Sequence, residues 1–168
     1  FTIAQLPLIV LLAAIAAIAA SVVGSRISVR FGPHRFAPVL FAFISLVQFV
    51  EWFVLGYSPR VAACVIYLHV AGIGAVLISL FWSLMNESFE PRSAKGIFGR
   101  VSGVGTLGGF VGGLLAERVA AWFGARDVVL LLAFLHLACA GLLWRGAPEP
   151  VARLQHRRDE PSPLDAVH

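Results

Sequence analysis

The sequence is poor in charge, since only 13% of its 168 residues are Asp, Glu, Lys or Arg. A soluble domain carries about 25% charged residues, so this scarcity excludes an ordinary soluble protein. Apolar residues take the place of charge. They make up 59% of the chain, and the mean hydropathy is +0.87. The composition therefore predicts several membrane-spanning segments.

Cysteine is scarce, and the residue groupings typical of active sites are missing. The two cysteines, Cys64 and Cys139, lie inside apolar runs without any CxxC or Cys/His spacing. We expect both to be small buried hydrophobic residues. No Ser/His/Asp set and no pair of carboxylates stands out either. The sequence therefore predicts neither an enzyme nor a bound metal or cofactor.

The chain is basic, with a net charge of +4 and a pI near 9.8. In a soluble protein this balance would suggest binding to nucleic acid. Here the basic residues lie at the ends of apolar runs, so membrane topology explains them better. We expect the lipid bilayer, and no nucleic acid, as a partner.

Five segments are apolar enough to cross a bilayer, which takes about 20 residues. They cover residues 3–23, 36–55, 61–84, 97–123 and 128–144. The connections at 56–60 and 124–127 are short, so each should join an antiparallel helical hairpin. The expected fold class is an all-α polytopic transmembrane helix bundle.

Positive charge alternates between the connections. Only Arg60, Arg118 and Arg126 fall at the second and fourth connections. The other ten of the 13 Lys and Arg residues are Arg26, Arg30, Arg35, Arg92, Lys95, Arg100, Arg145, Arg153, Arg157 and Arg158. Because cytoplasmic loops attract Lys and Arg, we expect the connections at 24–35 and 86–100 and the tail to be cytoplasmic. The expected location is the bacterial inner (cell) membrane.

The two ends of the sequence differ from its middle. Residues 146–168 mix charge with Pro148, Pro150, Pro161 and Pro163, which predicts a disordered tail or linker after a helical bundle at 1–145. The chain begins with Phe1 and enters an apolar run without a basic segment before it, so no signal peptide is expected. We expect a fragment with at least one helix missing upstream.

Residues 103–108 match GxGxxG, the fingerprint of dinucleotide-binding sites. That motif needs a preceding strand and a βαβ unit, whereas this one lies in an apolar, glycine-rich span. Glycines spaced i, i+4 instead predict a helix face that a neighbouring backbone approaches closely, either statically or during a conformational cycle. The face consists of Gly105, Gly108, Gly109, Gly112 and Gly113.

Three polar side chains interrupt the apolar spans. Glu51 lies near the end of its span, and such a carboxylate usually faces a bundle interior or an aqueous cavity. Gln48, three residues earlier on the same helical face, could line a solute pathway with it. Alternatively, Glu51 could reach the outer interface beside Trp52. His69 could relay protons, bind a ligand or simply hydrogen-bond a neighbouring helix.

The stretch at 81–100 interleaves acidic and basic residues. Pro91 is placed to begin a short helix that carries Arg92 and Lys95 on one face. Such a loop could latch two helix pairs through ion pairs, offer cations to an anionic solute, or act only as a positive-inside signal. The candidate pathway residues in this stretch are Asn86, Arg92, Lys95 and Arg100.

Two stretches resemble known transporters. Residues 24–35 resemble the loop after the second helix of major facilitator transporters, with Ser28 standing near the place of the family's acidic residue. Residues 81–116 are similar to the ATP/ADP translocase family of bacteria and plastids. The matching residues are Phe81-Trp82, Asn86, Phe89, Ala94-Lys95, Phe98-Gly99 and the glycine-rich run 103–113, with Asn86-Glu87 where members commonly carry Asn-Asp.

The resemblance implies a major-facilitator-like nucleotide transporter whose helices two to six of twelve correspond to the five spans. The first helix and the C-terminal half would then be missing. It also implies exchange of an anionic, nucleotide-type solute, such as ATP for ADP, by alternating access around a midplane site. Two alternatives stay open: a major facilitator carrier for another solute, and a non-transporting membrane module that anchors or regulates a soluble partner.

Overall fold

The computed structural model describes residues 6–89 and 91–146, all but a few of which lie in five helices. The helices are α1 (Leu6–Phe31), α2 (Pro33–Tyr57), α3 (Pro59–Ser88), α4 (Pro91–Trp122) and α5 (Ala125–Gly146). The expected all-α bundle is therefore confirmed. The predicted tail after Gly146 lies outside the described residues.

The helices are longer than the apolar runs because the charged residues that flank those runs do not stop a helix. Nothing in the sequence stops α1 before Gly32, which adopts a φ of 80° and is followed by Pro33 at the start of α2. Proline suits the first turn of a helix, where its missing N–H has no partner to lose. Pro59 and Pro91 begin α3 and α4 in the same way. The expected loops at 24–35 and 86–100 are thus largely helical, and Pro91 begins a long helix rather than a short one.

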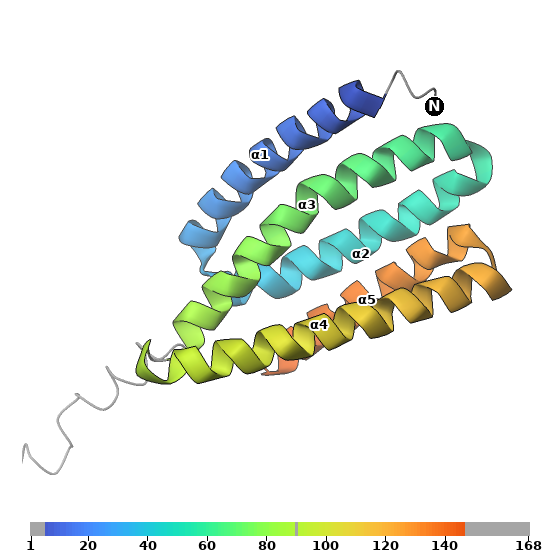
Figure 1. Cartoon of the computed structure of the whole chain (residues 1–168). Coiled ribbons are helices and arrows are strands. Elements are labelled where there is room, and N and C mark those ends of the chain that lie inside the picture. The colour runs from blue at the N-terminus through green and yellow to red at the C-terminus, as the bar shows by residue number, and fades with distance from the viewer. Residues whose placement is uncertain (1–5, 90, 147–168) are drawn as a thin grey trace, which may run out of the picture.

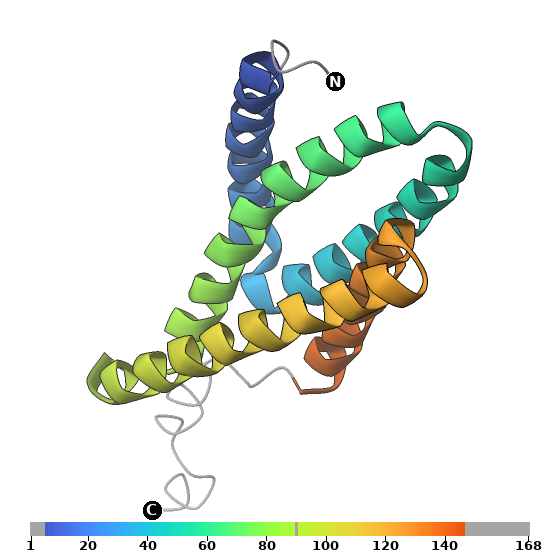
Figure 2. The same ribbon diagram turned by 45° about the vertical axis from the view of Figure 1, so that its right-hand side comes forward.

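Successive helices run antiparallel, as Figure 1 shows. The junctions α1–α2 and α3–α4 lie at one end of the bundle, called here the α1–α2 end. The junctions α2–α3 and α4–α5 lie at the other, called here the α2–α3 end. The most extensive packing joins α2 to α5 and α1 to α3, and α2 also packs against α3. Figure 2 shows α2 between α3 and the α4–α5 hairpin.

Four of the five helices in the described part are long and apolar enough to cross a membrane: α1, α2, α3 and α5. Helix α4 has the length but not the hydrophobicity, because glycine replaces larger apolar residues and charged residues stand near both its ends. The five expected spans are therefore five helices, of which α4 is the least apolar.

Most large apolar side chains point outward, among them Ile18, Phe43, Leu46 and Phe53. An exposed apolar surface of this extent would make a soluble protein aggregate, but it suits contact with lipid. The small buried core includes Ala37, Ile44, Ala62 and Ala133, together with the polar residues Ser45, Gln48 and Glu51. On α2, the residues that face the interior of the bundle are therefore more polar than those that face outward.

Close backbone approach occurs between α1 and α3. A Cβ added at Gly24 would lie 2.7 Å from Cγ1 of Val76, and one at Gly72 would lie 3.7 Å from the backbone of Ala16. Small residues at such crossings let membrane helices gain van der Waals contact. By contrast, a Cβ at any of the α4 glycines from 105 to 113 would meet no described atom within 4 Å. The predicted close packing of that face is not made within the described residues and stays a prediction.

The Gly24 contact can be tested by replacing Gly24 with Ala. The added methyl should collide with the stiff, β-branched Val76 and lower the free energy of unfolding by about 1–3 kcal/mol, although Ala by itself favours a helix by about 1 kcal/mol. Gly74→Ala is the matched control, since a Cβ there meets open space. Thermal unfolding in detergent should show the loss, and Val76→Ala should relieve it. A Gly24→Ala protein as stable as the parent would contradict the packing.

The orientation of the bundle can be tested with single cysteines in a protein whose Cys64 and Cys139 are replaced by Ala. Tyr57→Cys lies at the α2–α3 end and Asn86→Cys at the α1–α2 end, both at exposed positions. A membrane-impermeant maleimide added to intact cells should label the first and should reach the second only after permeabilisation. Labelling of both in intact cells would show that the two ends do not lie on opposite sides.

Candidate functional site

A buried acid–base pair joins α2 to α3. Nδ1 of His69 lies 2.8 Å from Oε1 of Glu51, and the two side chains are only 10% and 4% exposed. Glu51 lies six residues before Tyr57, the last residue of α2, or about 9 Å along the axis at 1.5 Å per residue. The carboxylate therefore points into the bundle and does not reach the outer interface beside Trp52.

Three polar atoms in this pair and in the neighbouring Gln48 have no hydrogen-bond partner among the described residues. Oε2 of Glu51, Nε2 of His69 and Oε1 of Gln48 are buried and accept no hydrogen bond from the described residues. Gln48 is 1% exposed and precedes Glu51 by three residues, so both occupy one face of α2. In the neutral tautomer whose Nδ1–H donates to Glu51, Nε2 of His69 carries a lone pair. All three orphaned atoms are then acceptors, which suit a proton, a water molecule or a cation.

The face of α2 that carries these residues is also fixed against α5. Oγ of Ser45 donates a hydrogen bond of 2.8 Å to the carbonyl of Ala133. Phe49 packs edge-on against Phe134, with ring centroids 5.3 Å apart. Sequence reasoning missed this contact, because a serine that bonds to a backbone carbonyl on a distant helix leaves no pattern in the sequence.

A second polar cluster holds α2 to α5 at the α2–α3 end. Nε1 of Trp52 donates a hydrogen bond of 2.8 Å to Oδ1 of Asp127, and Nε of Arg126 donates one of 3.0 Å to the carbonyl of Trp52. The Arg126 guanidinium also lies 4.1 Å from the centroid of a Trp52 ring, within the range of a cation–π contact. Arg126, counted in the sequence only as a topology signal, therefore has a structural role.

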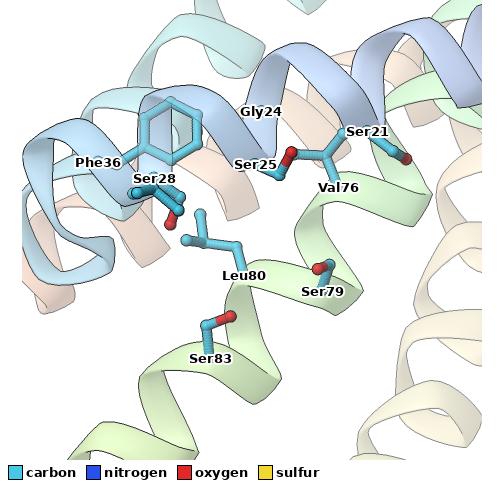
Figure 3. Close-up of a pocket in the computed structure, with 10 residues that line it drawn as sticks. Ser21, Gly24, Ser25, Ser28, Phe36, Val76, Ser79, Leu80 and Ser83 are labelled. Carbon is cyan, nitrogen blue, oxygen red and sulfur yellow. The ribbon is translucent and has the colours of Figure 1, made fainter.

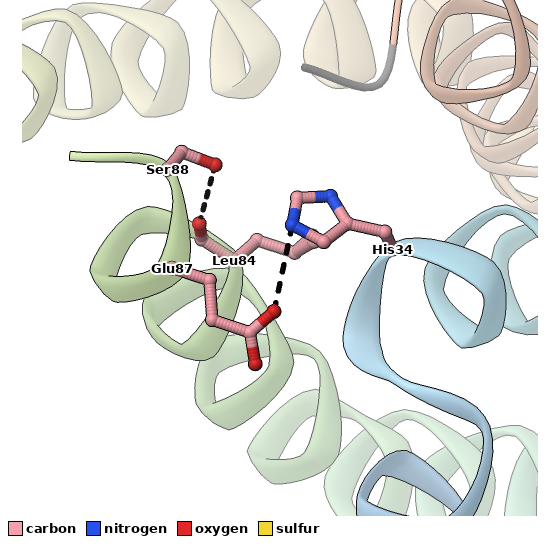
Figure 4. A network of polar contacts seen from close by, with 4 residues as sticks. All are labelled: His34, Leu84, Glu87 and Ser88. Carbon is pink, nitrogen blue, oxygen red and sulfur yellow. Dashed lines mark hydrogen bonds and ion pairs between the residues drawn. The ribbon is translucent and has the colours of Figure 1, made fainter. Parts of the chain in front are cut away.

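At the α1–α2 end, α2 and α3 meet through a charged contact, shown in Figure 4. Nε2 of His34 lies 3.5 Å from Oε2 of Glu87, while Oγ of Ser88 donates to the carbonyl of Leu84. The geometry is that of an ion pair rather than a hydrogen bond, so the contact is attractive only when His34 is protonated. A latch at this end was one of the alternatives left open for the 81–100 stretch. The contact here involves His34, which no pattern in the sequence singled out.

Of the candidate pathway residues in the 81–100 stretch, the structure describes the side chains of two. Asn86 and Arg100 are exposed, and they lie at the α1–α2 end, far along the helices from Glu51. The side chains of Arg92 and Lys95 are outside the described part of the chain. The structure thus brings Glu51 and His69 together, with Gln48 on the same face, and does not gather all the candidate pathway residues into one site.

A pocket lined by serine lies between α1 and α3 toward the α1–α2 end, as Figure 3 shows. Its volume is about 120 Å³, enough for several water molecules. Gly24, Val29, Phe36, Val76 and Leu80 complete its wall. The hydroxyl groups come from Ser21, Ser25, Ser28, Ser79 and Ser83. Spacings of three and four residues place the serines of each helix on one face, a pattern that the sequence analysis missed.

The coupling within the acid–base pair predicts a strongly non-additive pair of substitutions. Removing one partner leaves the other buried and unpaired, which costs about 3–5 kcal/mol. His69→Leu alone should therefore destabilise the protein more than Glu51→Leu and His69→Leu combined. Thermal unfolding in detergent of the parent, both single variants and the double variant measures the interaction. Additive losses would show that the two side chains do not depend on each other.

Comparison with known proteins supplies the family. The family model of the Major Facilitator Superfamily matches residues 1–166. No curated protein and no solved structure matched the chain. The family match agrees with the all-α bundle and its lipid-facing apolar helices. Because the match covers nearly the whole chain, this integral membrane protein belongs to the Major Facilitator Superfamily, a family of membrane transporters.

Proposed function

We propose that the chain forms part of a transporter that carries a nucleotide-type anion across the membrane by alternating access. The observation that carries the transport function is the buried Glu51–His69 pair. Ionisable residues inside membrane bundles are costly and usually mark solute or ion pathways. A bundle that only anchored a soluble partner would have no need of an acid–base pair between two of its helices.

The nucleotide specificity rests on the resemblance of residues 81–116 to ATP/ADP translocases. That stretch spans the end of α3, the α3–α4 junction and about the first four-fifths of α4. It supplies Arg92, Lys95 and Arg100, and cations near a pathway mouth attract an anionic solute and raise its rate of capture. In this proposal the α1–α2 end faces the cytoplasm of a bacterial cell, together with residues 147–168 as a polar tail.

The open glycine face of α4 fits the same proposal. In such transporters the substrate site lies between two halves of the protein, and a second half would offer helices to pack against Gly105, Gly109 and their neighbours. This arrangement requires a partner beyond the described residues. It also gives the face a role in movement, since small residues let one helix slide along another.

A carrier for a different solute is the second candidate, and one observation favours it. A nucleotide carries several negative charges, whereas the ionisable side chains buried in the described interior are Glu51 and His69. The arginines whose side chains the structure describes lie toward the ends of the helices. A neutral or cationic solute would suit this interior better than ATP.

Uptake of labelled ATP into proteoliposomes tests the proposal. The protein that contains this chain should accumulate ATP in exchange for internal ADP. Lys95→Gln should weaken the apparent affinity roughly tenfold or more, because a charge-assisted contact contributes about 1.5–3 kcal/mol. Arg60→Gln is the control, since it removes one positive charge at the opposite end of the bundle.

The other outcomes separate the alternatives. Uptake of other labelled solutes but not of ATP or ADP would favour the second candidate. If the Lys95→Gln, Arg92→Gln and Arg100→Gln variants take up ATP with unchanged kinetics, these residues act only as a positive-inside signal for membrane topology. A correctly folded protein that moves no solute would favour a membrane module without transport activity.

A further inference from the structure

We propose that an anionic phospholipid binds to the outside of the bundle, with one acyl chain in an apolar groove between α1 and α2 and its phosphate on Arg26 and Arg30. The site lies on the surface that faces the membrane. The proposal therefore goes beyond the transport function and does not depend on the solute.

The groove exists because α1 and α2 diverge. The two helices meet at Gly32 and point apart from there in both Figure 1 and Figure 2. They pack against each other much less than each of them packs against α3. Ile73 and Val76 of α3 line the groove together with residues of α1 and α2, and its volume is about 320 Å³. This volume lies within the range of clefts that hold small molecules.

The lining of the groove suits a hydrocarbon chain. Every residue that lines it is either apolar or glycine, so its side chains offer no hydrogen bond to a polar solute. Val23, Val39 and Phe43 line it and are 55–56% exposed. The groove is therefore open to the outside, where the neighbours of a membrane helix are lipid tails. A chain that lies between two helices gains van der Waals contact with both walls.

Two arginines continue the α1 wall of the groove toward the α1–α2 end. Arg30 follows Val23 by seven residues and Ile27 by three, which places it on the groove side of α1. It lies about 4.5 Å beyond Ile27 along the helix axis. A long side chain on a helix leans toward the helix N-terminus, which here is the direction of the groove. Arg26 lies one turn earlier, and both arginines are exposed.

The charges at this end favour an anionic headgroup over a neutral one. Arg26, Arg30 and Arg35 are all exposed there. Among the side chains that the structure describes at the α1–α2 end, Glu87 is the one carboxylate, and it lies 3.5 Å from His34. Basic pockets between transmembrane helices bind anionic headgroups, and each Lys or Arg near the membrane surface raises the affinity about fivefold.

A neighbouring helix, from the same protein or from a second copy, is the competing occupant. One helical turn is 5.4 Å long and about 10 Å wide, so it takes up roughly 400 Å³. That is more than the groove of about 320 Å³ holds. A helix could therefore only cover the groove with its side chains, whereas an acyl chain can lie inside it.

Native mass spectrometry of the protein that contains this chain tests the headgroup site, because it counts bound lipids. Phosphatidylglycerol should bind more tightly than phosphatidylcholine with the same acyl chains. Arg26→Gln and Arg30→Gln should each weaken the binding of phosphatidylglycerol about fivefold and leave that of phosphatidylcholine unchanged. Arg145→Gln is the matched control, since it removes an exposed positive charge at the same end of the bundle from α5, which does not line the groove.

The chain site is tested by filling the groove. Phosphatidylglycerol with a diazirine in one acyl chain should form crosslinks within residues 20–43 of the parent protein. Val39→Trp should abolish these crosslinks, because the indole ring would occupy the place of the chain. Val50→Trp is the matched control and should leave them intact, since Val50 is also 55% exposed on α2 but does not line the groove.

Four results would overturn the proposal. Phosphatidylglycerol binding that is unchanged in both arginine variants would remove the headgroup site, and crosslinks that survive in Val39→Trp would remove the chain site. Displacement of the lipid by glycerol 3-phosphate, which has the phosphate but no chain, would show a site for a free anion instead. A parent protein without crosslinks in residues 20–43, whose stability Val39→Trp lowers, would show that a helix covers the groove. A protein that moves no ATP leaves the lipid site untouched, because none of these measurements uses transport.

Discussion

Lipid gives membrane helices no hydrophobic reason to associate, because lipid tails are as apolar as the side chains they touch. This bundle must therefore depend on close backbone contact and on polar bonds between helices, and the polar bonds concentrate on α2. Ser45 and Trp52 bond to α5, and Glu51 bonds to α3. The positions of α3 and α5 are thus defined relative to α2, and α1 and α4 pack against those two helices.

The contacts of α1 are of a different kind. It meets α3 through small residues, including Ala16, Gly24 and Gly72, and beside them lies a pocket lined by serine hydroxyls. Van der Waals contact between small residues has little directional preference, whereas hydrogen bonds such as Ser45 to Ala133 fix both distance and angle. The bundle therefore combines a firmly bonded part, α2 with α5, and a smoother crossing between α1 and α3.

Sequence reasoning predicted the helices well because long apolar runs can only be helices in this composition. It placed their ends poorly at residues 24–31, where positive charge suggested a loop but no glycine or proline stops the helix before Gly32. The polar residues Gln48, Glu51 and His69 were conspicuous because charge is so rare in the spans. Their pairing was not predictable, since it depends on how α2 and α3 cross.

The glycines also show how little a sequence says about contacts between helices. The i, i+4 spacing singled out Gly105 and its neighbours on α4, which meet no described atom within 4 Å. The glycines that do make close contact, Gly24, Gly56 and Gly72, lie on three separate helices and have no such spacing. A motif within one helix indicates which face could be approached, but it cannot say which partner does so.

The two junctions of α2 differ in their freedom to rotate. Gly32 alone separates α1 from α2, and its φ of 80° belongs to a region that glycine enters and leaves without steric cost. Ser58 alone separates α2 from α3, and its Cβ confines its φ to negative values. A proline follows each of these two residues, so the junctions differ only in having glycine or serine. A change in the tilt of α1 would fall on the two torsions of Gly32, whereas Ser58 leaves α2 and α3, with their acid–base pair, less freedom to turn against each other.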